Sequence, residues 1–161
     1  MTCTFFGHHD TPDSIAPRLE SLLKHVIEAD GVRKFYVGSQ GKFDSLVKHT
    51  LFRLKESYPD IVCYVALYTF VKKDDFDVPF EKILFDGWEY AYPRFRIDYR
   101  NRCMLKDSDM VISYVISSYG GAAKYTNMAR RQGKAVYNLA DNSAENFPDG
   151  ARIAEGFVRK G

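Results

Sequence analysis

The residues best suited to bind or transform a ligand lie in three short turns that combine glycine with small polar or basic side chains. These turns are Gly7-His8-His9-Asp10, Gly38-Ser39-Gln40-Gly41 and Ser117-Ser118-Tyr119-Gly120-Gly121. A phosphate group needs close approach to backbone N–H donors and usually a nearby cation. Glycine permits the close approach because it has no Cβ atom. We therefore predict that the three turns together bind a phosphorylated ligand.

The third turn joins an apolar run to a helical pattern. Met110 to Ile116 is rich in β-branched residues and predicts a strand buried on both faces. Small residues then carry a helical pattern as far as Gly133. A helix starting here would direct free N–H groups and its positive end at an anion, unless the glycines serve backbone geometry alone. The predicted phosphate contacts are Gly120, Gly121, Ala122 and Lys124.

Two arginines and the first two turns supply the remaining candidate contacts. Arg100 and Arg102 are candidate cations, and the alternative is that both form surface ion pairs, which would contribute little. Adjacent histidines are as often plain loop residues as ligand contacts, so both interpretations stay open for that pair. The candidate contacts from the first two turns are Gly7, His8, His9, Ser39, Gln40 and Gly41.

An aromatic stretch precedes the segment that contains the arginines. One of its rings, Trp88 foremost, would stack on a nucleobase if the stretch covered the ligand. The alternative is that the rings pack over an edge of the sheet, as most aromatic residues of a domain this size do. The stretch comprises Phe85, Trp88, Tyr90, Tyr92 and Phe95.

No metal and no cofactor is expected. Cys3, Cys63 and Cys103 are widely spaced and odd in number, which predicts reduced thiols in the core. His8 and His9 have no Cys, Asp or Glu partner at the spacing of metal ligands.

Charge and hydropathy limit the classes of partner. The 23 basic and 21 acidic residues leave a net charge of +2 with histidine neutral, which does not favour nucleic acid as a partner. No segment has the length and apolarity of a membrane span or the pattern of a secretory signal. We therefore expect a cytoplasmic protein that has no membrane partner and binds a nucleotide-like small molecule. Formation of a homo-oligomer stays open.

Strand patterns alternate with helical ones, which predicts one Rossmann-like α/β domain over residues 1–161. This would be a three-layer sandwich, a mostly parallel sheet of about five strands with helices on both faces. Strand order 3-2-1-4-5 would place the ligand in a cleft between the first strand and the Met110 strand. Strands are expected at Thr2–Phe6, Phe35–Val37, Ile61–Leu67, Met110–Ile116 and Ala135–Leu139, with a short extra one at Lys82–Phe85.

The helices between these strands have recognisable ends. Pro12 is expected at the first position of the first helix, Pro59 is expected to end the second, and Pro93 to open the third. A solvated turn is expected at Lys72–Asp75 and a short helix around Ala151–Val158.

Several motifs resemble the SLOG superfamily, the Rossmann-like group that includes the DNA-processing Smf proteins and the LONELY GUY proteins. The pattern of a short bacterial branch has a Gly-His-Arg turn, a Gly-Gly-x-Gly-x-Phe-Asp turn, an Arg-Asn-Arg-x-Met helix, and a strand that follows Ser-Asp and ends in Gly-Gly. The corresponding segments here are Gly7-His8-His9, Gly38 to Asp44, Arg100-Asn101-Arg102-Cys103-Met104, Ser108-Asp109 and Gly120-Gly121.

The resemblance implies binding of a nucleotide or a nucleotide-like ligand, as a sensor or ligand-binding protein, and does not by itself imply catalysis. The phosphoribohydrolase branch uses an arginine and a glutamate to cleave the N-glycosidic bond. Arg100 matches that arginine, but Asn127 stands in place of the glutamate and cannot act as a carboxylate.

Two other functional classes stay open. One is a nucleoside N-glycosidase or deoxyribosyltransferase-like enzyme that draws its carboxylate from Asp10, Asp44 or Glu89. The other is a single-stranded nucleic-acid module in which Trp88, Tyr90, Tyr92 and the arginines form a stacking platform.

We predict that the wild-type protein does not release free base from nucleoside monophosphates at a meaningful rate. Departure of the base builds positive charge on the ribose, and the related hydrolases place a glutamate to stabilise it. Loss of such a charge-stabilising group costs about two to three orders of magnitude in rate, or about 3–4 kcal/mol. The measurement is steady-state base release from several nucleoside monophosphates, followed by chromatography. Robust turnover by the wild-type protein would contradict the prediction.

Overall fold

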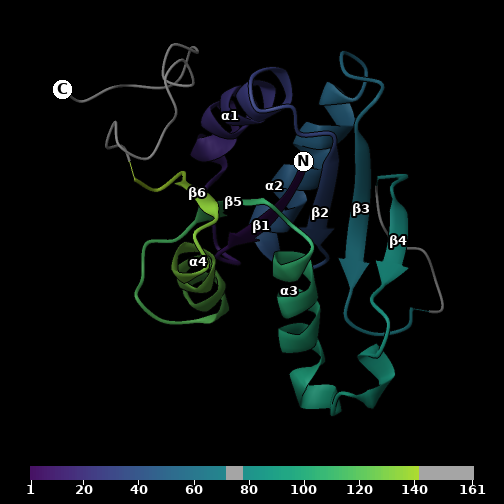
Figure 1. Ribbon diagram of the computed structural model, residues 1–161. Coiled ribbons are helices and arrows are strands. Elements are labelled where there is room, and N and C mark those ends of the chain that lie inside the picture. Colours follow the sequence, from purple (N-terminus) through teal and green to yellow (C-terminus); the bar gives the residue numbers. More distant parts are fainter. Residues whose placement is uncertain (72–77, 142–161) are drawn as a thin grey trace.

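Six parallel strands form one sheet in this computed structural model, which describes residues 1–71 and 78–141 (Figure 1). The strand order is β4-β3-β2-β1-β5-β6, and every neighbouring pair is parallel. This confirms the predicted α/β class and adds one strand to the five expected, because the short extra strand is a full member of the sheet. The strands are β1 Thr2–Gly7, β2 Lys34–Gly38, β3 Val62–Leu67, β4 Glu81–Leu84, β5 Met110–Tyr114 and β6 Ala135–Asn138.

Four α-helices cover the two faces of the sheet. Helices α1 (Ala16–Glu28) and α2 (Gly41–Leu54) pack on one face, and α3 (Arg96–Lys106) and α4 (Gly121–Arg131) pack on the other. The predicted three-layer arrangement is therefore confirmed. Short 3-10 turns at Asp13–Ile15, Trp88–Tyr90 and Pro93–Phe95 lead into α1 and α3.

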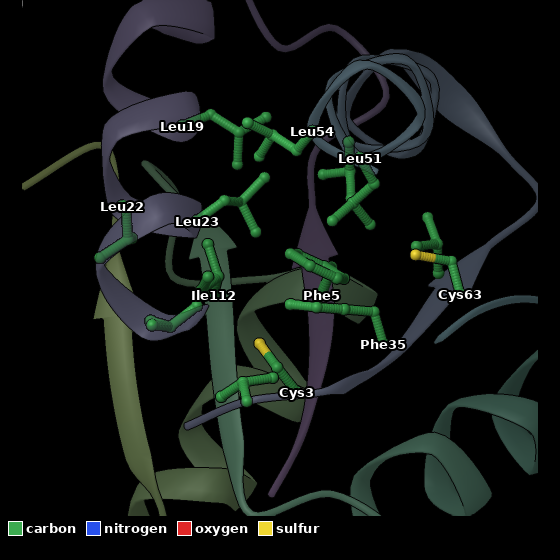
Figure 2. Packing of buried hydrophobic residues seen from close by; sticks show 14 of the residues in the cluster. Cys3, Phe5, Leu19, Leu22, Leu23, Phe35, Leu51, Leu54, Cys63 and Ile112 are labelled. Carbon is green, nitrogen blue, oxygen red and sulfur yellow. The ribbon is translucent and has the colours of Figure 1, made fainter. Parts of the chain in front are cut away.

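The larger core cluster lies between the sheet and the α1–α2 layer. Apolar side chains on α1 recur at helical spacing and pack against the sheet. There the rings of Phe5 on β1 and Phe35 on β2 stack, with their centroids 6.1 Å apart (Figure 2). Cys3 and Cys63 lie inside this cluster as free thiols, as the sequence predicts, whereas the prediction is wrong for Cys103, a free thiol that is only partly buried and lies outside the core. Burial raises the pKa of both thiols, to about 12 for Cys63, so neither is a reactive thiolate at neutral pH.

On the opposite face, α3 and α4 are joined by one carboxylate. Asp98 on α3 accepts hydrogen bonds from Lys124 Nζ at 2.8 Å, from Arg102 Nε at 2.9 Å and from the Tyr125 hydroxyl. Burial alone would raise the pKa of Asp98, but the bonds from Lys124 and Arg102 outweigh it and hold the pKa below its usual value. This cluster joins helices α3 and α4.

Some predicted boundaries are wrong by a few residues. Pro12 precedes a 3-10 turn, and Pro17 occupies the first turn of α1 instead. Helix α2 ends at Leu54, before Pro59. Strand β5 ends at Tyr114 because the next residue, Val115, turns its backbone N–H and C=O towards the Asn138 side chain instead of a neighbouring strand.

Two expected elements, the turn at Lys72–Asp75 and the helix around Ala151–Val158, lie outside the described residues. Among the helices that the structure does describe, none combines the length and apolarity needed to cross a membrane.

Candidate functional site

A cleft of about 330 Å³ opens at the carboxyl ends of β1, β2 and β5. The sequence predicts a cleft between β1 and β5, and these two strands are neighbours in the sheet. The chain connections that follow them run in opposite directions along the sheet. The floor of the cleft includes Phe5 and Phe6, and α3 forms one wall. The predicted residues that line it are Gly7, His8, His9, Gln40, Arg100, Gly120, Gly121 and Ala122.

The other four predicted residues lie close by but outside the lining. Arg102 and Lys124 are half-exposed and form ion pairs with Asp98, the alternative stated above for Arg102. Ser39 supports the cleft from behind, because its Oγ accepts a hydrogen bond from Arg100 Nη1 at 3.2 Å. Gly41 has φ +85° and packs against His9, where a Cβ atom would come within 2.4 Å of the ring.

Arg100 is the buried cation of the cleft. Only 5% of this residue is exposed, and its Nε and Nη2 donate to Asn101 Oδ1 at 3.2 and 3.0 Å. Burial lowers the pKa of the guanidinium, Asp44 opposes this effect, and an arginine remains charged at neutral pH. The bonds to Asn101 and Ser39 use three of its five N–H groups, and the other two have no hydrogen-bond partner in the described part of the chain.

Asp44 lies beside Arg100, under the end of β2. Its Oδ2 accepts the Gln40 backbone N–H at 3.1 Å. Burial raises the pKa of Asp44 to about 6, and the positive charge of Arg100 is the largest of the effects that oppose the rise. A Cβ atom on Gly38 would lie 2.5 Å from Asp44 Oδ2, so glycine at this position makes room for the carboxylate.

The N-terminus of α4 supplies backbone donors. Gly120 precedes it with φ +95°, a conformation that favours glycine, and no side chain in the described part of the chain caps the helix. The first N–H groups of an α-helix have no acceptor inside the helix, so those of Gly121 and Ala122 are available at the cleft. The predicted strand, glycine turn and helix are all present.

Two side chains from distant segments hold the loop that leads to this turn. His8 Nε2 accepts the Ile116 N–H at 2.9 Å, so its proton is placed on Nδ1. The Asn138 side chain pairs with the N–H and C=O of Val115 at 3.0 and 2.9 Å. Asn138 was not predicted, because an asparagine at the end of a strand carries no signal of a contact 23 residues away.

Other lining residues were missed or named only as alternatives. Asp10 and Asp44, two of the three candidate carboxylates, line the cleft, whereas the third, Glu89, is exposed outside it. Asn101, which orients Arg100, was not predicted as a site residue. Asn127 is exposed on α4 and accepts a hydrogen bond from Arg130, so a glutamate there would not face the cleft.

Part of the aromatic stretch packs against the protein, and part of it is exposed. Phe85 packs against Tyr36 over the sheet, with ring centroids 5.5 Å apart, and the Trp88 ring is covered by the Arg96 guanidinium at 4.9 Å. Tyr90 and Tyr92 are 87% and 72% exposed.

The described residues contain no group of three or more His, Cys, Asp or Glu side chains arranged to hold a metal ion. No protein-family model matches the sequence, and no curated protein matches it significantly.

The fold is similar to that of DNA processing protein A. The protein from Streptococcus pneumoniae superposes with a TM-score of 0.65 at 12% identity, over 94% of this chain and 54% of that one. The protein from Helicobacter pylori gives 0.55 at 12% identity, over 86% and 64%. This chain thus spans less than two thirds of the length of either, and the predicted resemblance to the Smf proteins is confirmed for the fold.

We predict that Asp44→Asn stabilises the protein at pH 8 and has little effect at pH 4. The pKa of Asp44 is about 6 in the folded protein and 3.8 in the unfolded one. The folded protein therefore loses stability as the pH rises between these values, because the carboxyl ionises freely only in the unfolded state. Above pH 6 the cost is about 3 kcal/mol, which the neutral amide removes.

Urea unfolding of both proteins at the two pH values measures this difference. Asp10→Asn, a loop carboxylate on the same cleft, is the matched control and should change stability by less than about 0.5 kcal/mol at either pH. Equal stability of wild type and Asp44→Asn at pH 8 would contradict the prediction.

Proposed function

We propose that this chain binds a nucleotide or a nucleotide-derived phosphorylated ligand in the cleft, as a sensor or ligand-binding protein. The observation that carries the proposal is Arg100, a buried guanidinium that lines the cleft and has two N–H groups without a hydrogen-bond partner among the described residues. Burying a charge costs free energy, and a protein retains such a group where it has a use. The α4 N-terminus lines the same cleft and adds backbone donors for an anion.

The charges of the cleft favour a ligand with few negative charges. Among the described lining residues, Arg100 is the one with a permanent positive charge, and Asp10 and Asp44 carry carboxylates. Lys124 and Arg102, which the sequence offers as further cations, are paired with Asp98. A monophosphate or a phosphodiester suits this balance better than a triphosphate, whose additional charges would meet the carboxylates. His8, His9 and Gln40 are then placed to contact ribose or base.

Arg100→Gln is expected to weaken nucleotide binding about ten- to hundred-fold, because it removes a charge-assisted hydrogen-bond donor. Lys124→Gln should weaken it less than about three-fold, since Lys124 is paired outside the lining. The measurement is titration calorimetry, after a thermal-shift screen in which a ligand at about a hundred times its Kd stabilises by about 2.7 kcal/mol.

Circular dichroism checks that both variants are folded. Wild-type affinity in folded Arg100→Gln would refute the assignment. A larger loss in Lys124→Gln than in Arg100→Gln would show that Lys124, as the sequence predicts, supplies the charge.

A second candidate function is binding of single-stranded nucleic acid. Tyr92, Phe95 and Tyr119 are exposed on loops at the carboxyl edge of the sheet, and base stacking on such rings is a common mode of single-strand binding. The structural neighbour from Helicobacter pylori is described by its single-stranded DNA binding mode. The near-neutral charge of this chain argues against a large electrostatic contribution.

Salt dependence separates the two candidates. Affinity for an oligonucleotide that contacts several phosphates falls steeply with salt, with a slope of about −0.7 per phosphate for single strands. We expect a slope no steeper than about −1 and no gain in affinity from a mononucleotide to a longer strand. A steep slope together with loss of affinity in Tyr92→Ala would favour the nucleic-acid function.

Asp44 is the observation that favours the enzyme alternative. A carboxyl with a pKa of about 6 in a cleft is able to donate or accept a proton near neutral pH. The assay of base release described above decides between binding and turnover.

A further inference from the structure

A second hollow of about 170 Å³ lies beside the cleft, at the carboxyl ends of β2 and β3. Gln40 lines both spaces. Arg100, which lines the cleft, donates to Ser39 Oγ and lies 5.9 Å from the centre of the Tyr68 ring, and both of these residues line the hollow. Gln40 therefore borders both spaces, and Arg100 contacts two residues of the hollow from the side of the cleft.

The size of the hollow fits part of a ligand. Pockets for whole small molecules start at about 300 Å³, a volume that the cleft reaches and the hollow does not. Neighbouring strands are about 4.8 Å apart, so the ends of β1 and β3 are separated by two spacings, or about 10 Å. A ligand with two linked groups bridges such a distance, and a free phosphate does not.

The chemistry of the hollow fits a nucleobase. Leu67 and the Tyr68 ring offer apolar surface to the face of a flat ring. The Gln40 amide carries both a donor and an acceptor, and the hydroxyls of Ser39 and Thr69 add further groups of both kinds. A base needs apolar contact on its face and hydrogen bonds at its edge, whereas a sugar has no flat face to stack.

Tyr68 is better placed for stacking than the other rings at this edge of the sheet. Tyr68 is half-buried and its ring centre lies 5.9 Å from the Arg100 guanidinium, whereas Tyr119 is 80% and Tyr92 72% exposed. A base that stacks on a mobile exposed ring must first order it, which costs entropy. Trp88, the ring favoured by the sequence, lines neither the cleft nor the hollow.

We propose that this hollow is the base subsite of the ligand whose phosphate occupies the cleft. Tyr68 stacks on the base and Gln40 binds its edge, while Arg100 and the α4 N-terminus bind the phosphate. This inference rests on the proposed function and deepens it, since it identifies the ligand as one with a base and a phosphate about two strand spacings apart.

The test compares ligands with and without a base. Ribose 5-phosphate and the four common nucleoside 5′-monophosphates are titrated into wild-type protein, Tyr68→Leu, Tyr68→Phe and the control Tyr90→Leu. Tyr90 is 87% exposed and lines neither space. We expect Tyr68→Leu to weaken binding of the preferred nucleotide about ten-fold or more, the usual effect of losing one stacked base.

Tyr68→Leu should bind ribose 5-phosphate as the wild type does, because the residues that contact the phosphate are unchanged. Tyr68→Phe and Tyr90→Leu should retain wild-type affinity for both kinds of ligand. Unfolding temperatures show whether Tyr68→Leu is folded, and if it is not, Gln40→Leu replaces it with the same expectation of a selective loss for nucleotides.

Three results would overturn the inference. Nucleotides that bind the wild type no more tightly than ribose 5-phosphate would show that no base subsite exists. A variant that loses both kinds of ligand equally would show that the changed residue supports the phosphate site instead. Wild-type protein that binds neither kind of ligand would overturn the proposed function itself, together with the subsite that rests on it.

Discussion

The candidate site depends on the burial of two opposite charges, Arg100 and Asp44, under the end of β2. Neither charge is neutralised by a close ion pair in the described structure. Arg100 donates hydrogen bonds to Asn101 and Ser39, Asp44 accepts one from the Gln40 N–H, and the two opposite charges attract each other. Gly38 is part of this arrangement, since a larger residue would displace the carboxylate. Burying two charges lowers the stability of the folded protein, and such buried charges are typical of functional sites.

Electrostatics elsewhere in the α3–α4 layer decide which cations remain for a ligand. Asp98 binds Lys124, Arg102 and the Tyr125 hydroxyl, so it joins two helices and draws two positive charges away from the cleft. One carboxylate thereby fixes the walls of the site and lowers its net positive charge. Our proposal of a ligand with few negative charges rests on this pairing.

The similarity to DNA processing protein A establishes the fold and leaves the ligand to be argued from the site. At 12% identity, few side chains are shared, and Rossmann-like sheets carry many functions at the same edge. The features that favour one candidate function over another are local. They are a cleft with one buried guanidinium, a hollow lined by a half-buried tyrosine, and exposed aromatic rings near the cleft.

The sequence by itself determined the class of fold and the edge of the sheet that carries the site. Hydrophobic periodicity located the strands and helices, and the glycine turns after β1, β2 and β5 marked the carboxyl edge, because both signals are local in the chain. Gly120 and Gly121, which line the cleft, were predicted in this way.

Only the tertiary structure decided how the charges and loops are used. Whether Lys124 faces a ligand or Asp98 depends on how α3 packs beside α4, and the part played by Asn138 depends on the pairing of β5 with β6. The raised pKa of Asp44 depends on burial that comes from several segments at once. These properties arise from contacts between residues far apart in the chain, and no local pattern of residue types records them.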